Sequence, residues 1–194
     1  MTVEMQPISS GQPISVEEFD ALPEDNSLIY EIENGFLLVN ARPAGPHIRA
    51  VKRLCVQLES QLPDEFEVLP DFETELPQGR SPRRVPDLVL VPWEVGDQTR
   101  VRGDQILLAI EVASSADSAV RDYAIKPDEY AANGIAHYWV VDVLENEQVG
   151  LTAYSLGDDG RYNRAPRVTG TVHFDQPFEL TVDLDALAGR GNRS

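Results

Sequence analysis

Two carboxylates interrupt apolar runs of this sequence where buried strands are expected. Asp87 stands directly before Leu-Val-Leu-Val, and Glu111 directly follows Leu-Leu-Ala-Ile. Burying an ionised carboxylate costs several kcal/mol unless a cation or hydrogen bonds compensate. If the two runs form neighbouring strands, both carboxylates can converge on one divalent cation. Ligands that are all oxygen atoms favour Mg²⁺ or Mn²⁺ over zinc.

A lysine, Lys126, follows fifteen residues after Glu111. Its ammonium group can orient an attacking water or neutralise charge on a pentacovalent phosphate. Each of the three residues also has a purely structural interpretation. Asp87 can cap a turn after Pro86, Glu111 can face water at a sheet edge, and most lysines are exposed. The residues alone leave both interpretations open.

The elements that must position these side chains are strands and helices of one α/β sheet structure. Apolar runs predict strands over 87–93, 105–113 and 135–143, and the middle run is typical of a strand covered on both faces. Residues 118–134 are predicted to be helical and to stop at Gly134. Pro127 disfavours helical geometry at the preceding residue, so this helix can be broken in two.

The N-terminal half predicts a short helix, a hairpin and a longer helix. Ser15 and Glu18 form a capping box for a helix that ends near Pro23. Residues 27–40 are predicted to be two strands joined by Asn34 and Gly35, the pair that best tolerates a type I′ turn. Residues 46–62 have apolar residues at helical spacing. Further β elements are expected over 66–76, 149–157 and 170–184.

Length and composition indicate one globular domain. The chain has 194 residues, of which 42% are hydrophobic and 25% charged. We expect a domain over 14–186, with flexible ends at 1–13 and 187–194. No apolar run is long enough to cross a bilayer and no signal peptide is recognisable, so we expect a cytoplasmic protein with no membrane partner. The single cysteine, Cys55, is interpreted as a reduced core residue.

The net charge of -17 argues against unspecific binding to nucleic acid, whose phosphates this field repels. The charge is unevenly distributed, however. Residues 42–126 hold 11 of the 16 basic residues, whereas 1–41 and 127–160 hold none. A locally basic face on an acidic body is therefore compatible with the sequence.

Several segments together resemble a known family. "VPDLVLV", "LLAIEVASS" and "RDYAIKPDEYAANGIAHYWVVD" resemble a branch of the PD-(D/E)XK nuclease superfamily that is labelled "putative restriction endonuclease". The segments 15–39 and 42–62 are similar to the opening of that family and to its histidine-containing helix. The resemblance covers about residues 14–185. It implies a restriction-endonuclease-like α/β fold, with a central mixed β-sheet flanked by helices and an N-terminal β-hairpin.

The resemblance also implies a metal-dependent phosphodiesterase site. Asp87 and Glu111 correspond to metal ligands, and the backbone carbonyl of Val112 to a further one, for Mg²⁺ or Mn²⁺. Lys126 takes the role of the superfamily's lysine, which usually stands two residues after the acid, where this chain has Ala113. Glu31 matches an early glutamate of the branch. Asp122 and Tyr130 match positions with supporting roles.

Other residues carry weaker signals. His47, Arg83 and Arg84 are candidate phosphate contacts. A lone histidine beside Pro46 is more often a local hydrogen-bonding residue, and a solvated loop explains the two arginines equally well. Glu31 shares a strand face with Glu33, so a solvated hairpin face is its alternative. Three residues are interpreted as packing aromatics: Trp93, Tyr138 and Trp139.

The expected function is a Mg²⁺-dependent endonuclease that hydrolyses DNA with a metal-activated water. A homodimer is expected, because two symmetry-related sites are the simplest means of cutting both strands. The alternatives are a nuclease-like fold that binds partners with little or no catalysis, and a phosphodiesterase acting on RNA or small nucleotides. The acidic charge favours either alternative over a DNA enzyme.

Overall fold

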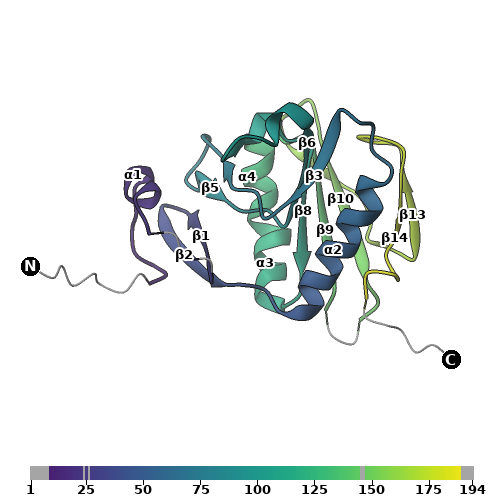
Figure 1. Ribbon diagram of the computed structural model, residues 1–194, viewed down its shortest axis with the longest axis horizontal. Helices are drawn as coiled ribbons and strands as arrows, with labels where there is room; N and C mark the ends of the chain where they lie inside the picture. The colour runs from purple at the N-terminus through teal and green to yellow at the C-terminus, as the bar shows by residue number, and fades with distance from the viewer. Residues whose placement is uncertain (1–8, 24, 26, 145–146, 189–194) are drawn as a thin grey trace, which may run out of the picture.

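A computed structural model describes residues 9–23, 25, 27–144 and 147–188. Its centre is a mixed sheet with helices on both faces (Figure 1), as the sequence predicted. The strand order is β11-β10-β9-β8-β6-β3, and β12 pairs with β10. Only β8 and β9 run parallel in this sheet, within the part of the chain that the structure describes. The strands are β3 (Phe66–Pro70), β6 (Leu88–Pro92), β8 (Leu108–Ala113), β9 (His137–Asp142), β10 (Gly150–Leu156), β11 (Tyr162–Arg164) and β12 (Val168–Thr169).

Alternation along the central strand β8 decides what each helix covers. Leu108, Ile110 and Val112 pack in one core cluster with α2 (Gly45–Glu59). The residues between them face the other core cluster, which includes Tyr130 of α4 (Lys126–Ala132). Because side chains alternate along a strand, Glu111 faces α4 and its neighbour α3 (Ala116–Ala124). Figure 1 shows α2 on one side of the sheet and α3 with α4 on the other.

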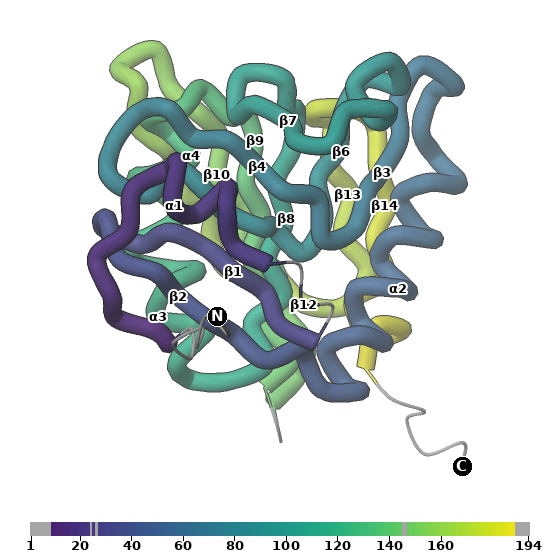
Figure 2. The backbone as a smooth tube through the Cα atoms, turned by 60° about the vertical axis from the view of Figure 1, so that its left-hand side comes forward, coloured from purple at the N-terminus to yellow at the C-terminus, as the bar shows by residue number. Residues whose placement is uncertain are grey.

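A second, smaller sheet has the order β2-β1-β5-β4-β7. Its hairpin, β1 (Leu28–Glu33) and β2 (Phe36–Ala41), confirms the predicted turn, since Asn34 and Gly35 have φ of 53° and 86°. The other strands have two residues each: β4 (Thr74–Glu75), β5 (Arg83–Arg84) and β7 (Val101–Arg102). The hairpin and α1 (Val16–Asp20) lie in front of the central sheet in Figure 2. The sequence did not predict that the hairpin would join a sheet.

The predicted break in the helical segment 118–134 is confirmed. Helix α3 ends before Ile125, whose φ and ψ are -113° and -57°, and α4 begins at Lys126 with Pro127 in its first turn. Gly134 follows α4 with a φ of 77°. The remaining elements are the hairpin β13 (Thr171–Phe174) and β14 (Leu180–Asp183), and two 3₁₀ turns, η1 (Trp93–Val95) and η2 (Gly103–Gln105).

Two features differ from expectation. Trp93 is 60% exposed, because η1 turns the chain outward where β6 ends, whereas Tyr138 and Trp139 are buried as expected. The stretch expected as an arginine loop contains strand β5, and both of its arginines are buried.

The described residues near the two chain ends contact the rest of the domain. Gly11 and Gln12 exchange backbone hydrogen bonds with Leu37, and Leu187 is buried in the core. The expected flexibility of 1–8 and 189–194 lies outside the described residues. Among the described residues, no helix is long and apolar enough to span a membrane.

Candidate active site

A pocket of about 180 Å³ lies where the two sheets meet α3 and α4. Strands β6 and β8 are antiparallel, with Leu88 opposite Ile110, so the start of one strand lies beside the end of the other. Asp87 and Glu111 therefore come to the same place, and both line the pocket together with Lys126 and Glu31. The pocket therefore brings together four residues that the sequence analysis proposed for the site: Asp87, Glu111, Lys126 and Glu31.

Glu111 is buried, with 3% of its surface exposed. Its Oε1 accepts a hydrogen bond of 2.6 Å from the Tyr130 hydroxyl, and its Oε2 lies 2.7 Å from Nζ of Lys126. Burial raises the pKa of Glu111 well above its usual value, Lys126 opposes this, and the charges of Asp122 and Asp87 raise the pKa further. The alternative of a water-facing edge position is excluded, because β8 is an inner strand.

Lys126 is buried as well, unlike an ordinary surface lysine. The break at Ile125 places it at the first position of α4, where Nζ also lies 3.1 Å from Oδ1 of Asp122. Burial by itself lowers the pKa of Lys126, but the charges of Glu111 and Asp122 outweigh it and raise the pKa above its usual value. The side chain therefore remains an ammonium group. Burial also raises the pKa of Asp122, while Lys126 lowers it.

Asp87 binds the end of strand β8 that extends beyond the pairing with β6. Its Oδ2 accepts a hydrogen bond of 2.6 Å from the backbone N–H of Val112, a residue that lies beyond the register of β6 and β8. The N–H and carbonyl of one strand residue point to the same side, so the Val112 carbonyl is also directed away from β9. Oδ1 of Asp87 lies 3.0 Å from Nε2 of His47. Burial lowers the pKa of His47, but Asp87 and the Val112 backbone raise it overall.

Glu31 closes the pocket from the hairpin side and is 5% exposed. Its Oε1 accepts a hydrogen bond of 3.1 Å from the backbone N–H of Val85, and its Oε2 accepts one of 3.2 Å from Asn40. Glu33 on the same strand pairs with Arg84 at 3.2 Å. Both glutamates thus have internal partners, which excludes the solvated hairpin face.

Arg83 and Arg84 are placed differently from the expected phosphate contacts. The side chain of Arg84 is 0% exposed and forms two hydrogen bonds, of 2.8 and 2.9 Å, with Glu129. Arg83 pairs with Asp20 at 3.0 Å and with Glu75 at 3.4 Å. Neither arginine lines the pocket. Both guanidinium groups are therefore used to join elements, and His47 is the one of the three candidates that lines the pocket.

The pocket is also lined by three residues to which no sequence pattern had pointed: Asn40, Ser118 and Arg121. Ser118, Arg121 and Asp122 share one face of α3, because positions i, i+3 and i+4 are neighbours on a helix. Because Asp122 matches a position of the family resemblance, the i, i+3, i+4 spacing could have indicated that Ser118 and Arg121 lie beside it at the same site.

The carboxylates of Asp87 and Glu111 are the type of ligand that a magnesium ion prefers. Mg²⁺ is commonly held by one or two protein carboxylates, with waters and substrate phosphates completing its ligands. Asp87 and Glu111 supply that number. Burial is the main cause of the raised pKa of Glu111, the charges of Asp122 and Asp87 add to it, and a cation would offset all three. Among the described residues, no group of three or more His, Cys, Asp or Glu side chains is arranged to hold a metal ion. Any ion must therefore take much of its coordination from water or substrate.

Comparison with known proteins bears on this geometry. The model of a family described as "Uma2: Putative restriction endonuclease" matches residues 16–186, which is most of the chain. The chain belongs to the Uma2 family. The match includes every residue of the pocket discussed above.

A solved structure extends the comparison to the fold. The chain is similar to a protein described as a putative nuclease belonging to DUF820 from Anabaena variabilis, with a TM-score of 0.68 and 17% identity. The alignment covers 90% of this chain and 97% of the other. At that identity the likeness shows a shared fold. No curated protein matches the chain.

Proposed function

We propose that the protein is a Mg²⁺-dependent endonuclease that hydrolyses phosphodiester bonds in DNA. The observation that supports it most is the convergence of Asp87, Glu111 and Lys126, distant in sequence, on one pocket of a chain in the Uma2 family. Glu31 adds a fourth charged group to the same pocket.

Asp87 and Glu111 would hold the metal, with the carbonyl of Val112 as a further ligand. When bound, a divalent ion in such a site lowers the pKa of a coordinated water and offsets charge on the phosphate. Glu111 is suited to this task because Tyr130 and Lys126 fix both of its oxygens. Asp87 is held by the Val112 N–H and by His47.

Lys126 would act as a fixed positive charge and hydrogen-bond donor. Because its pKa is raised, it does not accept the proton of the attacking water in this state. It would instead orient that water or stabilise the negative charge that develops on phosphorus before the 3′ oxygen leaves. Asp122, on the preceding helix α3, would hold Nζ in place, because its Oδ1 lies 3.1 Å from that atom.

A second candidate is a nuclease fold that binds nucleic acid or another partner without cleavage. Two observations favour it: the acids of the pocket already have internal partners, and the described residues contain no larger metal-ligating group. The net charge of -17 favours it as well.

A homodimer is part of the endonuclease proposal, since two active sites would cut both strands.

A plasmid-nicking assay tests the choice. Wild type and Asp87→Asn are incubated with supercoiled DNA in Mg²⁺, in Mn²⁺ and in EDTA. Metal-dependent nicking by wild type, lost in the variant, supports the endonuclease. Binding of DNA without cleavage in any ion supports the second candidate. Parallel incubation with RNA and with a dinucleotide identifies the substrate class if DNA remains intact.

A further inference from the structure

Three cationic side chains line the pocket: His47, Arg121 and Lys126. His47 contacts Asp87 at 3.0 Å, and Lys126 contacts Glu111 and Asp122 at 2.7 and 3.1 Å. Arg121 differs from both, because its guanidinium has no hydrogen bond or ion pair among the residues that the structure describes. The buried arginines nearby, Arg83 and Arg84, are each bound by carboxylates.

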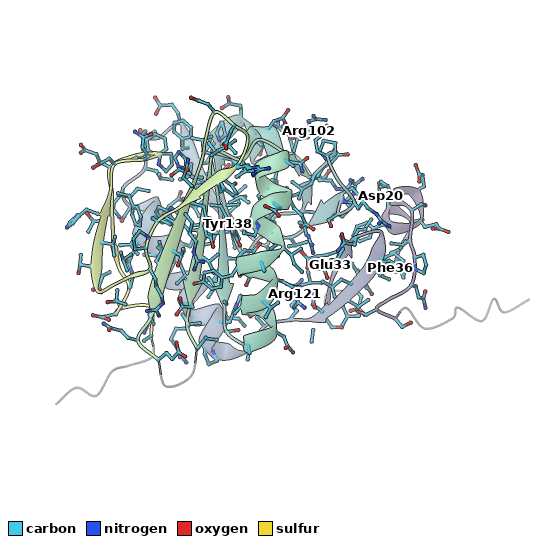
Figure 3. The ribbon with its side chains drawn as sticks, turned by 180° about the vertical axis from the view of Figure 1, so that it is seen from behind. Asp20, Glu33, Phe36, Arg102, Arg121 and Tyr138 are labelled. Atoms are coloured by element: carbon cyan, nitrogen blue, oxygen red, sulfur yellow. The ribbon has the colours of Figure 1, made fainter. Side chains whose placement is uncertain are left out.

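The position of Arg121 fits contact with a ligand in the pocket. It is half-buried, one helical turn beyond Ser118 and directly before Asp122. Figure 3 shows it on the part of α3 that lies nearest the β1–β2 hairpin, whose residues Glu31 and Asn40 line the same pocket. Glu111 and Lys126 are buried, whereas Arg121 lines the same pocket and is only half-buried, so its guanidinium is the more accessible of these groups to a ligand.

An arginine held at an acidic pocket without an acidic partner retains its full hydrogen-bonding capacity. Its planar group offers five N–H donors in a geometry that matches two oxygens of a phosphate. The acids of the pocket accept hydrogen bonds from the Tyr130 hydroxyl, backbone amides and Lys126, and none of them engages Arg121. An anionic ligand is therefore the partner whose chemistry best completes this side chain.

We propose that Arg121 binds a backbone phosphate of the nucleic acid in the active-site pocket. This inference rests on the proposed function and adds a substrate contact to it. The guanidinium also supplies a local attraction for phosphate on a protein whose net charge is -17. Arg121 is thus a substrate-binding residue, distinct from the groups that hold the metal or the attacking water.

The salt dependence of binding measures such a contact directly. Each phosphate neutralised by a cation contributes about 0.9 to the slope of log K against log salt for duplex DNA. We expect Arg121→Gln to lower that slope by about 0.9, measured by fluorescence anisotropy with a labelled duplex in Ca²⁺, with the DNA checked for integrity on a gel. Arg121→Lys should restore the slope, because a lysine still neutralises one phosphate.

Arg102→Gln is the matched control, because it removes the same charge from an exposed site whose arginine pairs with Asp104. Figure 3 shows Arg102 and Arg121 at separate places on the molecule. The control should keep the wild-type slope. In cleavage assays Arg121→Gln should raise KM about tenfold, with kcat changed less than about threefold, as expected for the loss of one charge-assisted hydrogen bond.

The outcomes separate the two proposals. If wild type binds and cuts DNA but Arg121→Gln has the slope and KM of the Arg102→Gln control, the inference about Arg121 is overturned and the endonuclease stands. If wild type neither binds nor cuts nucleic acid, both fail. Thermal unfolding confirms that each variant is folded, and Arg121→Ala, a better helix former, replaces the Gln variant if that one unfolds.

Discussion

Two buried cations of this protein are surrounded by carboxylates but differ in what lies beside them. Lys126 with Glu111 and Asp122, the lysine cluster, opens onto the pocket. Arg84 with Glu33 and Glu129, the arginine cluster, joins β1, β5 and α4 and does not line the pocket. Both clusters follow the rule that buried charges are paired.

Each cluster contains two carboxylates and one cation, but the clusters differ in how deeply their carboxylates are buried. In the arginine cluster Glu129 makes two hydrogen bonds to one guanidinium, a geometry that compensates burial well. In the lysine cluster two carboxylates share one ammonium, and the pKa values of both are raised, chiefly by burial. A buried ion pair therefore does not by itself indicate function. The deep burial of both carboxylates beside a pocket is what distinguishes the lysine cluster.

The largest expected effect is the loss of cleavage in Glu111→Gln. Removing the charge of a metal-binding acid should lower kcat/KM about 10⁴-fold, which is about 5.5 kcal/mol of transition-state stabilisation. The matched control is Glu129→Gln, the same substitution in the arginine cluster, which should keep the turnover of the folded protein. Equal activities in the two variants would contradict the assignment of roles.

The next effect is on stability. Arg84→Met leaves Glu33 and Glu129 without their cation, and we expect the free energy of unfolding to fall by about 3 kcal/mol. Removing one partner of a buried ion pair typically costs about 3–5 kcal/mol. We expect the lower value because the side chains of Glu33 and Glu129 are 24% and 16% exposed and can be hydrated. Urea unfolding followed by circular dichroism measures it. A midpoint equal to that of wild type would show that the arginine cluster is not what holds the hairpin.

Lys126→Met should act mainly on the reaction. Losing a charge aimed at the developing phosphate charge should lower kcat about 10²-fold, or about 2.7 kcal/mol, in the nicking assay. Its effect on stability should be smaller than that of Arg84→Met, because Glu111 and Asp122 have raised pKa values and can take up protons when the ammonium is gone. Unchanged kcat with a large loss of stability would make the lysine cluster structural, like the arginine cluster.

The two candidate metal-binding acids were easier to predict from the sequence than the residues around them. Asp87 and Glu111 stand out because a carboxylate in an apolar run needs a partner, and strand pairing does bring them together. Lys126 has no such local signal, and only the family resemblance pointed to it. The hairpin was predictable because the Asn34–Gly35 turn is a local property of the chain.

The role of Arg84 was not predictable, because its partners are far away in the sequence. Glu33 and Glu129 lie 51 and 45 residues from it, so no local pattern contains the cluster. An arginine-rich stretch of three cations in five residues is usually solvated, and only the long-range contacts of β5 bury it. The prediction that Trp93 is a packing residue was wrong for a local reason. Trp93 follows an apolar run, but the strand ends one residue before it.

The smallest expected effect is the pH dependence of Asp122→Asn. Because the folded-state pKa of Asp122 is raised, the protonated form stabilises the fold at low pH, and this contribution is lost as the pH rises above about 4. The Asn variant, which stays neutral, should therefore gain thermal stability relative to wild type as the pH rises above about 4. Tm measured at a series of pH values from about 4 upward checks the sign. Glu129→Gln should lower Tm at neutral pH, so two like substitutions act in opposite directions.

The most direct test of the account is where a divalent ion binds. Crystals soaked with Mn²⁺ should give one anomalous peak between Asp87 and Glu111, about 2.0–2.6 Å from a carboxylate oxygen of each. The peak should be absent in crystals of Glu111→Gln soaked in the same way. No peak in the wild-type pocket, or a peak bound elsewhere on the acidic surface alone, would contradict the proposed metal-dependent nuclease.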